Sequence, residues 1–183
     1  MNVYDFDNTI LRGDSTARFY AFCLARTPRM WLDIPCQLIN GALFLMRIRK
    51  KEAYKQRLLR FLNWIDVDAA VEAFWARNFC RVKSWYKKQH RPDDVVISAS
   101  PEFLIRPACE RLGIARVIGS PIDKNTVLYQ GNNCHGEEKV RAFRARFGSV
   151  QPDEFYSDSY SDSPMARISR RAFLVRGETL RPW

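Results

Sequence analysis

The sequence has few of the residues that build zinc sites and disulfide frameworks. Its 183 residues include only two histidines and five cysteines, and no two cysteines are spaced as CxxC. A structural zinc site needs about four ligands, so Cys134 and His135, the only adjoining soft ligands, are expected to be loop residues. An odd number of irregularly spaced cysteines is typical of free thiols in a reducing compartment, and we therefore expect a cytoplasmic protein.

Long apolar runs are also lacking. The chain starts with acids at Asp5 and Asp7, where a secretory signal would need an apolar segment. The most apolar stretch, residues 31–46, is interrupted by polar residues and is shorter than the roughly 20 residues of a membrane-spanning helix. No transmembrane segment is expected, and peripheral contact with a membrane surface stays open.

Acidic residues are outnumbered by basic ones, which gives a formal net charge of +10. Such a charge suits a phosphorylated substrate, an anionic membrane or a nucleic acid without choosing among them, and a solvated basic surface explains it equally well. The composition is 46% hydrophobic and 13% aromatic, so we expect one compact core, with room for a small insertion, rather than disorder.

The chain divides into an α/β core and a helical insertion. Short apolar runs typical of buried parallel strands occur at residues 3–6, 95–97, 116–118, 154–157 and 172–175. Helical patterns between them predict a Rossmann-like parallel sheet with helices on both faces. Residues 14–88 contain Gly41 as their only glycine, and residues 14–87 carry 14 basic and 6 acidic residues. We interpret this segment as a basic helical insertion, with residues 1–13 and 89–183 as the core.

Two smaller features are predicted within the core. Ser100 and Pro101 are expected to start the helix that follows residues 95–97, with the serine as its N-cap. Turn residues around 121–133 predict a small hairpin or flap.

Four groups of polar residues follow strand-like patterns, at the edge of a parallel sheet where ligands bind. They are Asp5 with Asp7, then Ser98, then Lys139, and finally Asp158 with Asp162. One carboxylate of the first pair can attack phosphorus while the other handles protons, and their repulsion favours a shared cation. A serine before a helix start and a lysine can hold phosphate oxygens, and acids on a loop suit magnesium.

Each group alone has a simpler explanation. Ser98 can be a helix cap, Lys139 a solvated side chain, and Asp158 and Asp162 acids that stabilise a helix N-terminus. The four groups together, in this order, are far more specific than any one of them.

That combination resembles the haloacid dehalogenase superfamily of phosphohydrolases. Its four motifs stand here as DFDNTI, VVIS, Lys139 in GEEKV, and YSDSYSD. The position of the helical insertion and the stretches SASPEF and YQGNNCHGEEKV look closest to the phosphoserine-phosphatase-like branch, which has a helical cap between its first two motifs. The resemblance covers the chain from Val3 to at least Val175.

The resemblance implies a set of roles for the site. Asp5 is the expected nucleophile that forms an aspartyl phosphate, and Asp7 the expected general acid and base. Thr9 is expected to orient Asp7. The remaining expected roles are phosphate binding by Ser98, Lys139 and the amides near Phe6 and Ala99, substrate binding by Ser100 and Asp14, and magnesium binding by Asp5, the Asp7 carbonyl, Asp158 and, indirectly, Asp162.

Some positions depart from the family pattern. Ser157 stands where a glycine is usual, and Ser100 replaces a glycine of phosphoserine-specific members. A phosphoserine enzyme also needs an acid and an arginine in the cap. Asp14 is near the expected place of the acid, whereas the candidates for the arginine cannot be told apart: Arg18, Arg47, Arg49 and Arg57. We therefore expect a small phosphorylated metabolite as the substrate without assigning phosphoserine.

The insertion leaves a second substrate class open. Apolar residues between Leu32 and Met46 are followed by a basic run from Arg47 to Lys51. The favoured interpretation is that the apolar residues form the insertion's own core. The alternative is contact with an anionic lipid surface, which would suit a phosphatidylglycerophosphate-type substrate.

Rival functions have less support in the sequence. A basic nucleic-acid-binding module is possible by charge, with Trp64, Trp75, Trp85 and Tyr86 as stacking residues, but no binding motif is present and no nucleic acid is expected. A phosphotransferase or phosphonatase would also use Asp5, although no lysine is marked for a Schiff base. The sequence has no signature of an oligomeric state.

Overall fold

A six-stranded sheet forms the centre of the molecule, which we describe from a computed structural model covering residues 1–48 and 51–183. The strand order is β3-β2-β1-β4-β5-β6. All neighbouring strands are parallel except β5 and β6, which form an antiparallel hairpin. The strands are β1 (Asn2–Tyr4), β2 (Val95–Pro101), β3 (Arg116–Ser120), β4 (Glu154–Ser157), β5 (Arg171–Arg176) and β6 (Thr179–Pro182).

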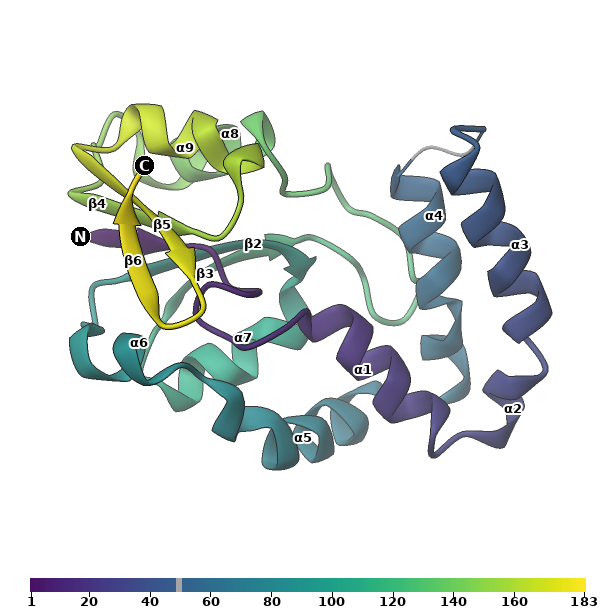
Figure 1. Ribbon diagram of the computed structural model, residues 1–183. Helices are drawn as coiled ribbons and strands as arrows, with labels where there is room; N and C mark the ends of the chain where they lie inside the picture. The colour runs from purple at the N-terminus through teal and green to yellow at the C-terminus, as the bar shows by residue number, and fades with distance from the viewer. Residues whose placement is uncertain (49–50) are drawn as a thin grey trace.

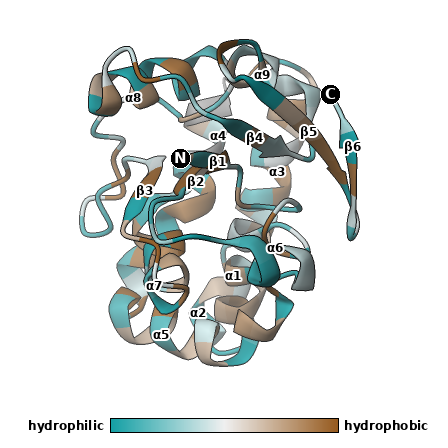
Figure 2. Ribbon diagram, turned by 90° about the vertical axis from the view of Figure 1, so that its left-hand side faces the viewer, coloured by the Kyte–Doolittle hydropathy of each residue, from teal (hydrophilic) through white to brown (hydrophobic). Residues whose placement is uncertain are grey.

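Helices cover both faces of this sheet (Figure 2). The helices α8 (Glu137–Phe147) and α9 (Ser163–Ile168) pack on one face, where Val3 of β1 and Phe155 of β4 are buried. The opposite face buries Tyr4 and Tyr156 against α1, α5, α6 and α7. Successive residues of one strand thus enter different cores, as the alternation of a strand buried on both sides requires. The predicted α/β class and parallel sheet are confirmed.

The described part of the segment between β1 and β2 consists of helices joined by loops. Its helices are α1 (Ser15–Leu24), α2 (Pro28–Trp31), α3 (Ile34–Leu45), α4 (Lys51–Leu58), α5 (Val67–Asn78) and α6 (Ser84–Gln89), with short 3-10 helices η1 (Leu59–Trp64) and η2 (Phe79–Arg81). α1 and α5 contact α7 (Glu102–Arg111), which is part of the core, whereas α3 packs on α4 and projects away from the sheet (Figure 1).

Specific side chains fix the helices of the insertion and connect one of them to the core. The Asp14 and Asp66 side chains accept hydrogen bonds at the N-termini of α1 and α5, as N-caps do. The buried Trp75 of α5 donates from Nε1 to the carbonyl of Leu104 in α7 at 2.6 Å. The prediction that residues 14–88 form one separate cap domain stays a prediction. The contacts join α1 and α5 to the core, whereas α2–α4 project from it.

The burial of the apolar residues of α3 differs from what the favoured interpretation predicts. Leu38, Ile39, Leu45 and Met46 are exposed, together with Leu32. They do not form a core of the insertion, because α3 packs on α4 with one side and exposes these residues on the other. Arg49 and Lys50, counted above in the basic run, lie outside the described residues.

One local prediction needs correction, and another is confirmed in a shorter form. Ser100 is not the N-cap of α7, because β2 continues through Pro101 and the helix begins at Glu102. The small hairpin or flap predicted around residues 121–133 is present as a short antiparallel turn with one bridge, between Ile122 and Tyr129. The strand β6 was not predicted, since it is short and mostly exposed and therefore has no apolar run.

All five cysteines are free, as their irregular spacing predicts. Among the described residues, no helix is long and apolar enough to cross a membrane.

Candidate active site

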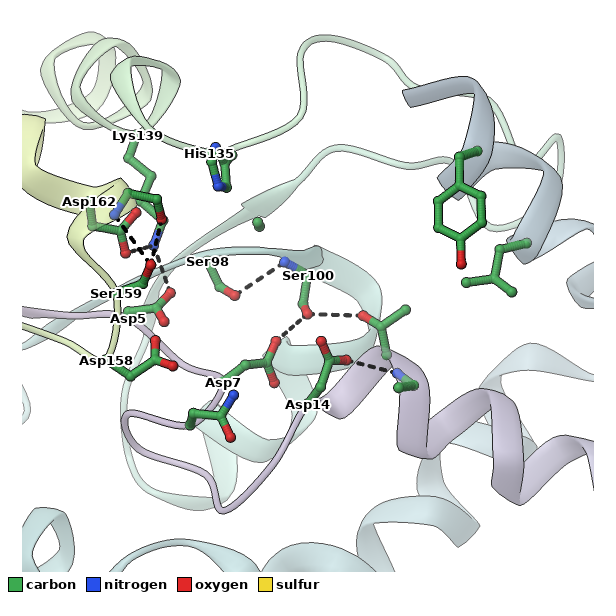
Figure 3. A pocket seen from close by; sticks show the side chains of 17 residues that line it. Asp5, Asp7, Asp14, Ser98, Ser100, His135, Lys139, Asp158, Ser159 and Asp162 are labelled. Atoms are coloured by element: carbon green, nitrogen blue, oxygen red, sulfur yellow. Dashed lines mark hydrogen bonds and ion pairs between the residues drawn. The ribbon is translucent and has the colours of Figure 1, made fainter. Parts of the chain in front are cut away.

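The predicted site residues gather at the carboxyl ends of three neighbouring strands, β2, β1 and β4. A cavity of about 380 Å³ opens there. The site residues that line it are Asp5, Asp7, Asp14, Ser98, Ala99, Ser100, Lys139, Asp158 and Asp162 (Figure 3). The structure thus brings together residues that are up to 157 positions apart in the chain. Their chemical roles stay predictions.

Asp5 lies at the floor of this cavity. Its backbone amide donates to the Tyr156 carbonyl at 2.8 Å, which continues the pairing of β1 with β4. Its Oδ1 accepts a hydrogen bond from Lys139 Nζ at 2.6 Å. Burial raises the pKa of Asp5 to about 7, the Lys139 charge opposes this, and Asp162 adds to it. The ionised form of Asp5 is therefore stabilised by the charge of Lys139.

Lys139 is a buried cation placed between two acids. It lies in the first turn of α8, and its Nζ also donates to Asp162 Oδ2 at 2.7 Å. Burial works against the charged form, but the charges of Asp5 and Asp162 outweigh it and raise the Lys139 pKa. Asp162 is held in turn by Ser157 Oγ, which donates to the same oxygen at 2.7 Å. The ammonium is thus fixed beside Asp5 and remains charged at neutral pH.

Asp7 is held from the opposite side of the cavity. Its Oδ2 accepts from Ser100 Oγ at 2.5 Å, and its Oδ1 accepts from the Ser15 amide at 2.7 Å. Burial and the nearby Asp14 charge raise the pKa of Asp7 to about 6, while the bonds from Ser100 and Ser15 lower it. A group with a pKa close to neutrality can both release and accept a proton, as general acid–base catalysis requires.

The loop after β1 is fixed by residues on both sides. Thr9, expected to orient Asp7, instead donates to Asp5 Oδ2 at 3.4 Å and accepts from the Asp158 amide at 2.9 Å. The difference arises because the loop turns at Asn8, which has a φ of 55°, and directs Thr9 toward β4. The buried Lys83 donates from Nζ to the Asn8 carbonyl. Nothing in the sequence distinguishes Lys83 from the other basic residues of the insertion.

Other predicted residues contribute in different ways. Asp14 lines the cavity while its carboxylate caps α1 by accepting from the Ala17 amide at 2.8 Å. Phe6 lies outside the cavity in the core, edge-on to Trp75 at 5.9 Å between ring centroids. Ser98 Oγ accepts from the Ser100 amide at 3.1 Å.

The wall opposite Asp5 includes residues that motif reasoning missed. Tyr54 and Leu58 of α4 line it, as do Thr16 and Ala17 at the start of α1. These residues carry no motif, and only the placement of α1 and α4 beside the cavity makes them part of it. The head-group arginines Arg18, Arg47 and Arg57 are absent from the described lining, and Arg49 lies outside the described residues.

Comparison with known proteins identifies the family. The sequence profile of the haloacid dehalogenase-like hydrolases matches residues 3–167. The chain belongs to this family. This hydrolase is also 28% identical to Protein CicA of Caulobacter vibrioides, over 91% of this chain and 81% of that protein. The resemblance inferred from the four motifs is confirmed.

Solved structures with low sequence identity share the fold. A protein of unknown function from Bordetella pertussis Tohama I has a TM-score of 0.77 at 20% identity, covering 94% of this hydrolase and 87% of that chain. A phosphoserine phosphohydrolase-like protein from Francisella tularensis has a TM-score of 0.61 at 14% identity, with 94% and 86% covered. At these identities the likeness concerns the fold.

Proposed function

We propose that this hydrolase is a magnesium-dependent phosphatase that removes phosphate from a phosphomonoester through an aspartyl-phosphate intermediate on Asp5. One observation carries the proposal: the Asp5 carboxylate contacts a buried lysine at the floor of a cavity that Asp7 also lines. A lysine used only for structure needs no such cavity beside it, and a carboxylate with a raised pKa in a cleft is typical of a functional site.

Asp5 and Asp7 divide the chemistry between them. In the first step an Asp5 carboxylate oxygen forms a bond to phosphorus, while the bond from phosphorus to the ester oxygen breaks. Asp7 gives its proton to that departing oxygen. In the second step Asp7 takes a proton from water as the water oxygen attacks phosphorus, and Asp5 is released as a carboxylate. Asp7 ends with the proton that it lost in the first step.

Lys139 and Ser98 bind the phosphoryl group in this proposal. The Lys139 ammonium stays charged and is fixed by Asp162, so it needs no reorganisation as negative charge develops on the phosphoryl oxygens. The buried Ser98 hydroxyl lies at the end of β2 and lines the same cavity. Amides of the loop after β1 are additional donors.

The donors beside Asp5 fit a magnesium ion. Among the described residues no group of three or more His, Cys, Asp or Glu side chains is arranged to hold a metal. Magnesium takes one or two carboxylates together with water and substrate oxygens, and Asp5, Asp158 and the Asp7 carbonyl supply that kind of set. Burial and the nearby Asp162 charge raise the pKa of Asp158, as expected for acids that share a cation. Bound magnesium would neutralise charge on the phosphoryl oxygens.

The cavity limits the choice of substrate. Its volume of about 380 Å³ and its wall of Tyr54 and Leu58 suit a small phosphorylated metabolite. A lipid-linked phosphomonoester is the second candidate, and the specific observation that favours it is the exposed apolar side of α3.

Phosphate release from a panel of metabolites and dispersed lipid phosphates tests the proposal. We expect magnesium-dependent turnover of at least one substrate, lost on chelation and in Asp5→Asn. Asp68→Asn, which changes an exposed acid of α5, is the matched control and should retain activity. Full turnover by folded Asp5→Asn would reject the covalent route. Binding of single-stranded oligonucleotides without hydrolysis of any phosphomonoester would instead favour the nucleic-acid-binding alternative.

A further inference from the structure

The outer side of α2 and α3 exposes an unusual number of large apolar side chains. We call this surface the α3 face and define it by Trp31, Leu32, Leu38, Ile39, Leu45 and Met46. Leu32 and Leu45 are 82% and 81% exposed. In α3 and its C-cap residue, the members Leu38, Ile39, Leu45 and Met46 lie at positions i, i+1, i+7 and i+8, so they share one side of the helix. Scattered apolar residues are ordinary on a protein surface, but a continuous stripe marks a contact site.

The stripe is not covered by the rest of the described chain. The inner side of α3 packs on α4: Asn40 donates from Nδ2 to the Tyr54 carbonyl at 3.2 Å, and the Phe44 ring stacks on Tyr54 at 4.6 Å. Figure 1 shows α3 at the edge of the molecule, with α4 between it and the sheet. The α3 face therefore points away from the protein, and an external partner is needed to cover it.

Between residues 26 and 48, the exposed charges that flank the α3 face are all positive. Arg26, Arg29 and Arg47 are exposed near its ends. The only acid between residues 26 and 48 is Asp33, which is paired with Arg57 at 3.7 Å and accepts from Gln37 at 2.6 Å. Its charge is thus balanced within the protein. A partner of the α3 face should be apolar and should carry negative charge at its edge.

These requirements select among partners. A second copy of this chain would cover the apolar side chains but would bring like-charged arginines together, which is unfavourable. An anionic bilayer surface offers acyl chains to the leucines and phosphate groups to the arginines. Trp31 donates from Nε1 to the Leu24 carbonyl at 3.1 Å, so its ring can enter an apolar layer with its polar atom already satisfied.

We propose that the α3 face is a membrane-docking surface by which this protein lies on an anionic lipid bilayer without crossing it. The apolar side of α3 enters the interface, as in-plane amphipathic helices do, and the arginines remain at the level of the headgroups. The inference does not depend on the proposed phosphatase activity, because none of its residues lines the cavity. α4 connects the two regions, because its Tyr54 stacks on Phe44 of α3 and also lines the cavity.

Vesicle co-sedimentation of the full chain tests the proposal. The probes are vesicles of phosphatidylcholine alone and of phosphatidylcholine with phosphatidylglycerol, at low and at physiological salt. We expect binding to the anionic vesicles only, weakened by salt. Leu45→Gln/Met46→Gln should reduce the partition coefficient about tenfold or more, because two apolar side chains lose their burial. Arg47→Gln should reduce it about fivefold.

Matched controls separate docking from a loss of folding. Leu128→Gln and Val150→Gln replace apolar residues that are each 52% exposed but lie elsewhere on the surface, and they should bind vesicles like the wild type. All variants should keep the thermal midpoint of the wild type, because the changed side chains are exposed.

Three outcomes would overturn the proposal. The first is no binding to anionic vesicles at low salt. The second is a loss of vesicle binding in the Leu128→Gln control equal to that in Leu45→Gln/Met46→Gln. Vesicle binding would then be a general effect of surface hydrophobicity. The third is a wild-type dimer, detected by light scattering, that Leu45→Gln/Met46→Gln dissociates while vesicle binding stays unchanged. That third result would assign the α3 face to a second copy.

Discussion

Replacing Lys139 by methionine should destabilise the protein strongly, because this change leaves two buried carboxylates without their cation. Lys139 is 2% exposed and lies 2.6 Å from Asp5 and 2.7 Å from Asp162. Breaking a buried ion pair by removing one partner costs about 3–5 kcal/mol. Methionine keeps the apolar stem of the side chain, so the loss comes mainly from the missing charge. We expect a decrease of this size in the free energy of unfolding in urea at pH 8, without divalent metal.

A second substitution isolates the electrostatic part of that loss. In Asp5→Asn/Lys139→Met one of the two acids is neutral, while Asp162 still accepts from Ser157. The double variant should therefore lose less stability than the sum of the two single variants, with a coupling of about 1–3 kcal/mol. Lys124→Met is the matched control, since Lys124 pairs with Asp68 at an exposed site, where an ion pair contributes about 1 kcal/mol or less.

The loss in Lys139→Met should also depend on pH. In the wild type the folded-state pKa of Asp5 is about 7, above its ordinary value of 3.8, so the folded state binds a proton more tightly than the unfolded state. Stability from this group is complete below the unfolded-state pKa and falls as pH rises through the folded-state pKa. Lys139 lowers the Asp5 pKa, and its removal raises that pKa further. The variant's deficit should therefore be smaller at pH 5.5 than at pH 8.

The reasoning would be refuted by a Lys139→Met protein that matches the Lys124→Met control in urea at pH 8. A deficit that is identical at both pH values would also contradict it, because the deficit would then come from packing rather than from unpaired carboxylates.

Further substitutions test other parts of the account. Lys83→Met should lower kcat about tenfold or more with less effect on KM, since the catalytic loop loses its lysine anchor; an unchanged kcat in steady-state assays would argue against this positioning role. Gly119→Ala should lower the free energy of unfolding in urea by about 1–3 kcal/mol, because the new Cβ would lie 2.5 Å from the backbone of α7. Gly41→Ala, with open space around the new Cβ, should instead raise that free energy by about 0.5–1 kcal/mol. Ser100→Ala removes a hydrogen bond that lowers the Asp7 pKa, so the alkaline limb of the kcat/KM profile should move to higher pH.

The sequence was sufficient to predict the sheet and the residues at its edge. Buried parallel strands leave continuous apolar runs, and polar residues directly after such runs are placed by the strands themselves. Asp5, Ser98 and Asp158 could therefore be assigned to one edge of the sheet from the sequence alone. The strand β6 has no such signal, since its residues are mostly exposed.

Contacts between distant segments could not be read in the same way. Lys83 is one of many basic residues in the insertion, and only its burial beneath the loop after β1 distinguishes it. Thr9 was matched to the wrong acid, because its partner depends on a left-handed turn at Asn8. The apolar pattern of α3 was consistent with an internal core or with an external contact. That choice depended on how many neighbours the helix has, which periodicity does not show.

The direct test of the central claim is chemical trapping of the phosphorylated residue. The enzyme is quenched during turnover of a phosphomonoester with magnesium and reduced with borohydride, which converts an acyl phosphate to an alcohol, and its peptides are then analysed by mass spectrometry. The account predicts homoserine at position 5 and none in Asp5→Asn. Reduction at Asp7 instead, or steady turnover with Asp5 always unmodified, would contradict it.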